Sequence, residues 1–345
     1  MVKCGNKKLA IISILLFFIS TEVVALTYCE AARKDNISEF KKYYFSGQSL
    51  ETECGYGVSA LYWAVYSGSE RVVRFMLEHG ANPNQTNYGD GSTALEEAVK
   101  GGRYEIAYAL MNAGANANQL RPGDDHTPLF WAIHDYTDSS CSPRLIKTLL
   151  KNGASVNETF WGDENPLMRA SKFNCVAGVK IFLENNADVN YVDSFGNTAL
   201  TSVFENKEDA SYDIAKLLLE RGATVDFLQG KSGIWGQSPL VIAPPYADKH
   251  IMSLFLDIGI NPNVLITLNN NRMPMDFFYK GSLSDALNHG GTLLMIAASY
   301  GNKEVVELLL EKGAEANYSV KGENGNHTAK RLALENGHTN IADML

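Results

Sequence analysis

The phrase LEHGANPN at residues 77–84 returns in altered form at six later places in the chain. The later copies read LMNAGANAN (110–118), LLKNGASVN (149–157), LENNADVN (183–190), LLERGATVD (218–226), LDIGINPN (256–263) and LLEKGAEAN (309–317). With Gly47 as a degenerate first instance, the marker Gly or Asn stands at 47, 80, 114, 153, 186, 222, 259 and 313. The spacing is about 33 residues with local insertions, and such a period indicates a repeat array.

A second phrase precedes most of these markers. It reads STALEEAV (92–99), HTPLFWAI (126–133), NTALTSVF (197–204), QSPLVIA (237–243) and GTLLMIAA (291–298). In segments such as EIAYALMNAG (105–114), apolar residues recur at three- and four-residue spacing, which predicts a helix with one buried stripe. The closing Gly suits a left-handed helix cap, and one helix pair cannot bury its faces alone. The pattern therefore predicts stacked helix pairs.

Together the two phrases resemble the ankyrin repeat, whose pattern runs D-x-x-G-x-T-P-L-H-x-A, then two short helices and G-A-D-x-N. The nearest single match is DSFGNTAL at 193–200, and the resemblance covers nearly all of residues 26–345. It implies an all-α solenoid of about nine helix-loop-helix units with hairpin-like connecting loops. We place the units near 26–58, 59–92, 93–126, 127–164, 165–197, 198–237, 238–291, 292–327 and 328–345.

Three segments depart from the repeat pattern. The inter-helix loop HDYTDSSCSPR (134–144) gains five residues. Pro244 and Pro245 predict that a first helix ends after Ala243. An insertion at 264–290 is either a tolerated surface loop or a cover for a ligand or partner, since long loops in compact arrays are often functional. In the second case Phe277, Phe278 and Tyr279 would form the cover.

The first 25 residues have the three parts of a secretory signal peptide. Lysines at 3, 7 and 8 precede the apolar run Leu9–Ile19, and small or aliphatic residues precede a cleavage point after Ala25. The apolar run is too short to span a bilayer. The sequence therefore predicts export, to the periplasm or to the medium, with no membrane span left after cleavage. The alternatives are an uncleaved anchor and lipidation at Cys29.

Charge restricts the class of partner. The formal net charge is −9, and removal of residues 1–25 would shift it to −11. Because an acidic protein repels phosphate polyanions, we expect no nucleic-acid ligand and favour a protein partner, which charge complementarity would make basic.

An exported chain with an even cysteine count favours disulfides. Cys4 leaves with the signal, so Cys29, Cys54, Cys141 and Cys175 remain. Cys141 and Cys175 fall in the inter-helix loops of adjacent units, and the five-residue insertion around Cys141 would bring them within reach. Cys29 and Cys54 would pair by elimination. The alternative is four buried free thiols.

The residues do not assemble a catalytic, cofactor or metal motif, so we predict that the chain is not an enzyme. The GKS at 230–232 lacks the first glycine of a phosphate loop. His79, His126 and His338 occupy positions where ankyrin repeats carry polar residues for loop bonding. An enzyme remains an alternative if the insertion, whose carboxylates are Asp276 and Asp285, holds a close acid and base pair or a metal.

The resemblance implies a concave binding face built from loop tips and the exposed edge of each first helix. Aromatic residues dominate the positions that match it, and aromatic side chains are enriched at binding hot spots. The partner-binding candidates are Tyr56, Tyr66, Asp90, Asp124, Tyr136, Trp161, Phe173, Phe195, Trp235, Tyr246 and Tyr300.

The function predicted from these features is a protein-binding module that works outside the cytoplasm and inhibits or sequesters its partner. A concrete form is a periplasmic immunity-type protein that occludes a toxin. The alternatives are a secreted host-directed effector, a structural interaction protein and, less favoured, the enzyme described above.

Overall fold

The computed structural model describes residues 27–55, 57–87, 90–120, 126–133, 141–160, 163–204, 211–225, 238–267 and 281–345, but not the side chains at 242 and 246. The chain divides into an N-terminal part ending at Ser155 and a C-terminal part starting at Val156. Helices dominate both parts, which confirms the predicted all-α repeat architecture.

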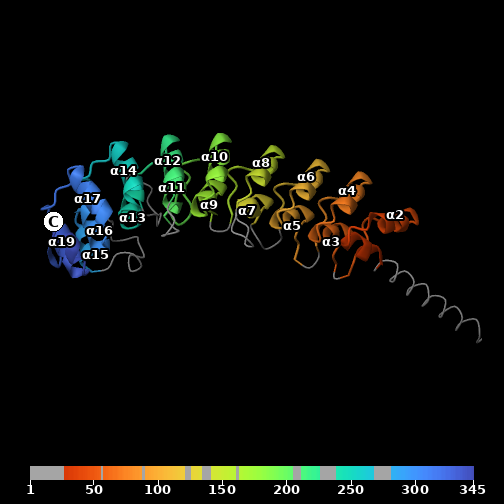
Figure 1. The fold of residues 1–345 in the computed structure, drawn as a ribbon, viewed down its shortest axis with the longest axis horizontal. Coiled ribbons are helices and arrows are strands. Elements are labelled where there is room, and N and C mark those ends of the chain that lie inside the picture. Colours follow the sequence, from red (N-terminus) through yellow and green to blue (C-terminus); the bar gives the residue numbers. More distant parts are fainter. Residues whose placement is uncertain are drawn as a thin grey trace, which may run out of the picture. The chain divides into compact units, whose positions relative to one another are not determined.

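The N-terminal part opens with a helical segment at 27–33. Its labelled helices are α2 (Ile37–Phe45), α3 (Ala60–Tyr66), α4 (Glu70–Glu78), α5 (Ala94–Lys100), α6 (Tyr104–Asn112), α7 (Pro128–Ile133) and α8 (Pro143–Lys151). First helices pack on first helices, α3 on α5 and α5 on α7, while the second helices α4, α6 and α8 pack in a parallel row. Figure 1 shows these two rows.

The C-terminal part repeats the arrangement. Its helices are α9 (Pro166–Lys172), α10 (Val176–Glu184), α11 (Ala199–Ser202), α12 (Tyr212–Glu220), α13 (Pro239–Tyr246), α14 (Lys249–Asp257), α15 (Ser282–Asn288), α16 (Leu293–Tyr300), α17 (Lys303–Glu311), α18 (Ala329–Glu335) and α19 (Thr339–Ala342). Two short antiparallel pairs join them: β1 (Leu265–Ile266) with β2 (Gly291–Thr292), and β3 (Val320–Gly322) with β4 (Gly325–His327).

Local chemistry sets the ends of the helices. The Thr93 hydroxyl accepts the Glu96 N–H at the start of α5, as an N-cap residue does. Second helices end on a left-handed residue, for example Gly153 at φ +89°. Asn186 takes the same place after α10 at φ +62°, because asparagine tolerates this conformation better than most residues. The marker positions of the sequence repeat are therefore helix caps.

The closing Asn of the repeat phrase bonds one repeat to the next. Asn84 donates to the Gly114 carbonyl (2.9 Å) and accepts the Asn116 N–H (2.7 Å). The same two bonds recur at Asn118 with Gly153 and Ser155, at Asn190 with Gly222 and Thr224, and at Asn263 with Gly313 and Glu315. In the first repeat Glu51 replaces the asparagine and accepts the Asn82 N–H (3.0 Å). We call this series the asparagine ladder.

We expect Asn84→Ala to lower the free energy of unfolding by about 1–2 kcal/mol, because it leaves the Gly114 carbonyl and the Asn116 N–H without their partner. Urea denaturation checks this. Asn112→Ala is the matched control, since Asn112 is exposed on α6 and forms no part of the ladder. Equal losses in the two variants would show that the ladder does not stabilise the stack.

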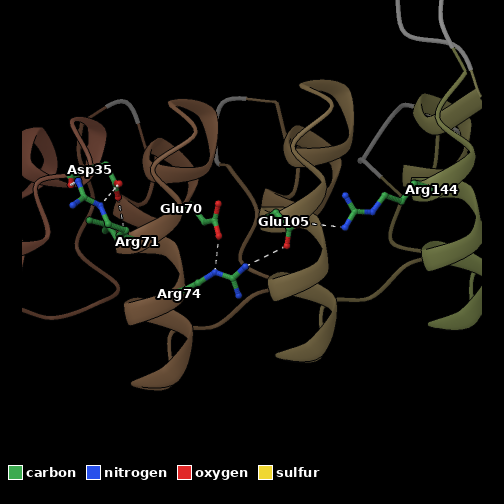
Figure 2. A network of polar contacts seen from close by, with 7 residues as sticks. Asp35, Glu70, Arg71, Arg74, Glu105 and Arg144 are labelled. Carbon is green, nitrogen blue, oxygen red and sulfur yellow. Dashed lines mark hydrogen bonds and ion pairs between the residues drawn. The ribbon is translucent and has the colours of Figure 1, made fainter.

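Charged side chains on the second helices of the N-terminal part pair with one another. Figure 2 shows Glu105 accepting hydrogen bonds from both Arg74 (3.5 Å) and Arg144 (3.1 Å), while Arg74 also bonds Glu70 (2.8 Å). Each such exposed pair contributes at most about 1 kcal/mol. We call this surface the second-helix face. Its charged side chains are therefore largely paired with one another within the chain.

The first repeat is closed by an aromatic stack and a disulfide. Tyr28 is buried and stacks on Phe40, with ring centroids 4.4 Å apart. A disulfide joins Cys29 to Cys54, with the Cα atoms 5.5 Å apart, which confirms that predicted pair. Cys141 and Cys175 are also both disulfide-bonded. The alternative of free thiols at these four positions is therefore wrong.

The prediction that Pro244 and Pro245 end the first helix after Ala243 is wrong. Helix α13 continues to Tyr246, with both prolines inside it. Proline removes an N–H donor, but its fixed φ suits a helix, so the prolines add a further turn at the end of α13. Here the Asn302 side chain donates to the carbonyls of Pro244 (3.1 Å) and Ala247 (3.0 Å).

The structure describes both ends of the 264–290 insertion, residues 264–267 and 281–290. The insertion begins with β1 and finishes with α15, and β1 pairs with β2 so that Leu265 lies opposite Thr292. Phe277, Phe278 and Tyr279 lie outside the described residues, as does Asp276.

Candidate functional site

The first helices of the N-terminal part carry several side chains that are not buried. We define its first-helix face by side chains that are not buried: Tyr62, Trp63 and Tyr66 on α3, Glu97 and Lys100 on α5, Trp131 on α7, and Asp90 in the loop before α5. Leu61, Ala64 and Val65 of α3 are buried on the other side. Helical periodicity thus separates packing residues from this face.

A chain of hydrogen bonds runs along the face. The Ser92 hydroxyl lies 2.7 Å from Asp90 Oδ1 and 3.0 Å from the Tyr62 hydroxyl. Tyr62 donates to Glu97 Oε2 at 3.2 Å. Arg103 Nη1 lies 3.7 Å from Glu97 Oε1. These contacts join two neighbouring repeats and fix the carboxylates of Asp90 and Glu97 around the half-buried Tyr62.

The surroundings shift the pKa values of two residues in this series of hydrogen bonds, Tyr62 and Glu97. Burial raises the pKa of Tyr62 to about 12, and the nearby charges of Glu97 and Asp90 act in the same direction, against the hydrogen bond from Ser92. Burial also raises the pKa of Glu97, although the hydrogen bond from Tyr62 and the charges of Arg103 and Lys100 oppose it. Tyr62 therefore stays a neutral donor at physiological pH.

The basic side chains of the face hold its aromatic residues in place. Lys100 pairs with Glu96 (2.7 Å) and lies over the Trp131 ring, 3.9 Å from its centroid. Arg103 donates to the Tyr66 carbonyl at 2.6 Å. Tyr66 itself is 53% exposed and packs edge-on against Trp63, with centroids 5.7 Å apart. Its ring is presented to solvent from a fixed backbone.

The structure brings two of the eleven predicted partner-binding residues, Tyr66 and Asp90, onto this face. In the C-terminal part Phe195 is 59% exposed, Tyr300 is half-buried at the end of α16, and Phe173 is half-buried beside Arg169. Tyr246 belongs to α13, but its side chain is not described. Tyr56, Asp124, Tyr136, Trp161 and Trp235 lie outside the described residues.

Sequence reasoning missed Tyr62, Trp63, Glu97 and Trp131. A signal for three of them was present, because Trp63, Glu97 and Trp131 each stand four residues after the Ser or Thr that precedes their helix. Counting from the helix start would have placed them at one equivalent position. The equivalent residues of the C-terminal part, Arg169, Ser202 and Ile296, are buried.

Asp285 of the insertion forms a close acid and base pair with His327, which lies outside the insertion in β4. Asp285 on α15 lies 2.8 Å from His327 Nε2. However, Asp285 is only 7% exposed and His327 is fully buried, and the carboxylate also accepts the N–H groups of Glu323 (2.9 Å) and Asn324 (2.7 Å). A general base must reach a substrate proton, and the burial of both groups prevents this.

The residues that the structure describes lack two kinds of feature. Among those residues, no three His, Cys, Asp or Glu side chains are grouped so that they could bind a metal ion. None of the described helices combines the length and the apolar character that crossing a bilayer requires. The GKS segment at 230–232 lies outside the described residues, and His79 bonds the Phe75 carbonyl of its own helix (2.8 Å).

Comparison with known proteins agrees with the fold. A human protein, transient receptor potential cation channel subfamily A member 1, is 27% identical over 207 residues, covering 55% of this chain and 18% of that protein. An ankyrin repeat protein of fowlpox virus is 28% identical over 181 residues (51% and 46%), and one of Acanthamoeba polyphaga mimivirus is 33% identical over 103 residues (28% and 61%). The chain spans less than two thirds of each relative's length.

The family model described as ankyrin repeats (3 copies) matches residues 28–121, 110–193, 137–229, 207–317 and 275–345. These overlapping matches cover both parts of the chain, including every helix of the first-helix face. With the paired helices, the capped second helices and the asparagine ladder, they show that the chain belongs to the ankyrin-repeat family.

Proposed function

We propose that the first-helix face of the N-terminal part binds a partner protein and that binding occludes or sequesters that partner. Ankyrin repeats are protein-protein interaction modules, which supports the class of function. The observation that carries the assignment to this face is the exposed Tyr66 ring packed against Trp63, on a backbone held by Arg103. The same face carries the carboxylates of Asp90 and Glu97, which the hydrogen bonds through Ser92 and Tyr62 hold in place. Rigid aromatic side chains are typical binding anchors.

The partner surface is basic in this proposal. The chain carries a formal net charge of −9, and the face holds Asp90 and Glu97, while Lys100 is engaged by Glu96 and Trp131. Complementary charge accelerates association and is screened by salt. Association should therefore slow as ionic strength rises, whereas a salt-independent rate would contradict a basic partner.

The chain acts outside the cytoplasm in this proposal, with residues 1–25 as its export signal. Disulfides persist in oxidising compartments, so the Cys29–Cys54 bond supports export. A periplasmic immunity-type protein that covers a toxin is the concrete form. N-terminal sequencing of the periplasmic fraction should find a chain that starts at Leu26. An intact chain in the cytoplasm would contradict export, and release into the medium would favour a host-directed effector.

We expect Trp63→Ala combined with Tyr66→Ala to weaken partner capture at least tenfold, because two aromatic anchors at an interface centre contribute about 2 kcal/mol or more. Affinity capture from the compartment that holds the chain, followed by titration with the captured protein, measures the effect. Tyr108→Ala is the control, since Tyr108 is exposed on the second helix α6 of the same part. Unchanged capture by the double variant would rule out this face.

A further inference from the structure

Three hydrogen-bond donors converge on one carboxylate at the end of the insertion. The N–H groups of Glu323 and Asn324, in the turn between β3 and β4, donate to the two oxygens of Asp285 at 2.9 and 2.7 Å. His327 Nε2 lies 2.8 Å from Oδ2. His289, one turn further along α15, hydrogen-bonds the Asp285 main-chain carbonyl through Nδ1 (2.8 Å), and this nitrogen lies 3.2 Å from Oδ1. The arrangement is a preformed anion-binding turn with an imidazole beside it.

The site is shielded from solvent, and it favours the ionised form of the Asp285 carboxyl. Asp285 is 7% exposed, and the His327 ring has no exposure. Burial alone would raise the pKa of Asp285, but the hydrogen bonds from Asn324, Glu323 and His327 outweigh it and hold that pKa well below its ordinary value. Charge-assisted bonds of this kind are among the stronger polar contacts in proteins.

The Asp285 carboxylate occupies a space, which we call the seat, that exists because Gly322 has no side chain. Gly322 precedes the turn, and a Cβ atom built there would collide with the Asp285 carboxylate. Its φ is not in the left-handed region, so the backbone does not require glycine at this position. The space above Gly322 is what the carboxylate uses.

Helix α15 is the support that carries Asp285 to this seat. Its Leu283, Ala286 and Leu287 are buried, and the helix contacts α16 as well as β2, β3 and β4. Helix α16 is buried from Leu293 to Ser299. Figure 1 shows α15 beside α16 near the C-terminal end of the chain.

We propose that the β3–β4 turn, Gly322 and His327 form a carboxylate-binding site, and that Asp285 of the insertion is its resident ligand. The Asp285 contact then holds α15 against the β3–β4 turn. A carboxylate from another molecule can bind in the same place once the Asp285 side chain is removed. The site belongs to the C-terminal part and binds an acidic group, whereas the first-helix face belongs to the N-terminal part and is proposed to bind a basic partner.

Asp285→Ala tests the site by emptying it. Hydrogen exchange of the Glu323 and Asn324 amides should accelerate about ten- to hundredfold, the loss expected for bonds to a charged acceptor. Exchange in α12, which belongs to the same C-terminal part but packs on other helices, should not change, which verifies that this part is folded. Sodium formate should restore most of the lost protection, whereas sodium chloride at equal ionic strength should not. Unchanged exchange in the variant, or equal restoration by the two salts, would overturn the proposal.

Gly322→Ala is the matched variant, because it fills the seat while Asp285 is kept. Exchange of the same two amides should accelerate, and formate should fail to restore protection. Asp285→Asn provides a further check with nearly unchanged side-chain size, and it should lose the same protection. Rescue of Gly322→Ala by formate would show that the seat is not where the carboxylate binds.

Two capped probes distinguish the sources of an incoming carboxylate. N-acetylaspartic acid amide carries the group on a side chain, as Asp285 does, and N-acetylglycine carries it at a chain end. We expect the aspartate probe to protect the two amides of Asp285→Ala. Protection by N-acetylglycine alone would contradict a side-chain ligand.

Discussion

Replacing both Cys29 and Cys54 with serine is expected to destabilise the first repeat by about 3 kcal/mol, because the disulfide closes a loop of 25 residues and removes that much entropy from the unfolded chain. The bond ties the helical segment at 27–33 to the residues that follow α2. Terminal repeats have a neighbour on one side only, so they depend on such additional contacts. The loss should appear as fraying of this end.

Hydrogen exchange measures that fraying directly. The amides of α2 should lose protection in the double variant, while those of α6 keep it, since contacts in a repeat array reach only adjacent repeats. Adding a reductant to the double variant should leave exchange in α2 unchanged, whereas it should accelerate α2 exchange in the original protein. Equal α2 protection in the two proteins would mean that Tyr28 and Phe40 hold the repeat without the disulfide.

Asp285→Asn is expected to lower the free energy of unfolding of the C-terminal part by about 3 kcal/mol at pH 7. The amide cannot accept from three donors as the carboxylate does. Its NH2 group replaces one carboxylate oxygen and therefore faces either the Glu323 N–H, at Oδ1, or the Asn324 N–H and His327 Nε2, at Oδ2. Removing one partner of a buried charged contact leaves the other groups unpaired, which accounts for the size of the loss.

The difference between the two proteins should depend on pH in a defined direction. The pKa of Asp285 is lower in the folded chain than its ordinary value of 3.8, so the ionised group stabilises the fold above that value. As the pH falls towards the folded pKa this contribution is lost, and at pH 3 the difference should be about 1 kcal/mol smaller than at pH 7. Urea titrations at the two pH values test this. A difference that stays constant would show that the carboxylate charge contributes nothing.

The repeat architecture could be predicted because its determinants are local and recur. The apolar stripe of each second helix, the marker at Gly153 or Asn186, and the closing asparagine at Asn84 or Asn190 each have the same physical role in several copies. The structural role of a position that recurs in register can be predicted from the sequence alone, because no knowledge of tertiary contacts is needed.

Features that depend on contacts across the chain could not be predicted in the same way. Helix α13 contains two prolines, and its C-terminal end is held by Asn302, more than 50 residues later, which bonds the carbonyls of Pro244 and Ala247. Asp285 meets the N–H of Glu323 38 residues away. No period in the sequence encodes either pairing.

The candidate site was predicted only in part for a related reason. Counting from the D-x-x-G phrase located Asp90, and the end of a first helix located Tyr66. Tyr62 and Glu97 lie 35 residues apart and become neighbours only when α3 packs on α5. Burial of Arg169 and Ile296 at positions equivalent to Trp63 also required the folded chain, because their surroundings come from other segments.

Position-specific photocrosslinking tests the central claim, that the first-helix face of the N-terminal part is the binding surface, most directly. A benzophenone side chain replaces Tyr66 in one protein and Tyr108 in another, so that two exposed tyrosines on opposite faces of one part are compared. The account predicts that irradiation with the partner gives an adduct from position 66 and none from position 108. An adduct from position 108 and none from position 66 would contradict it.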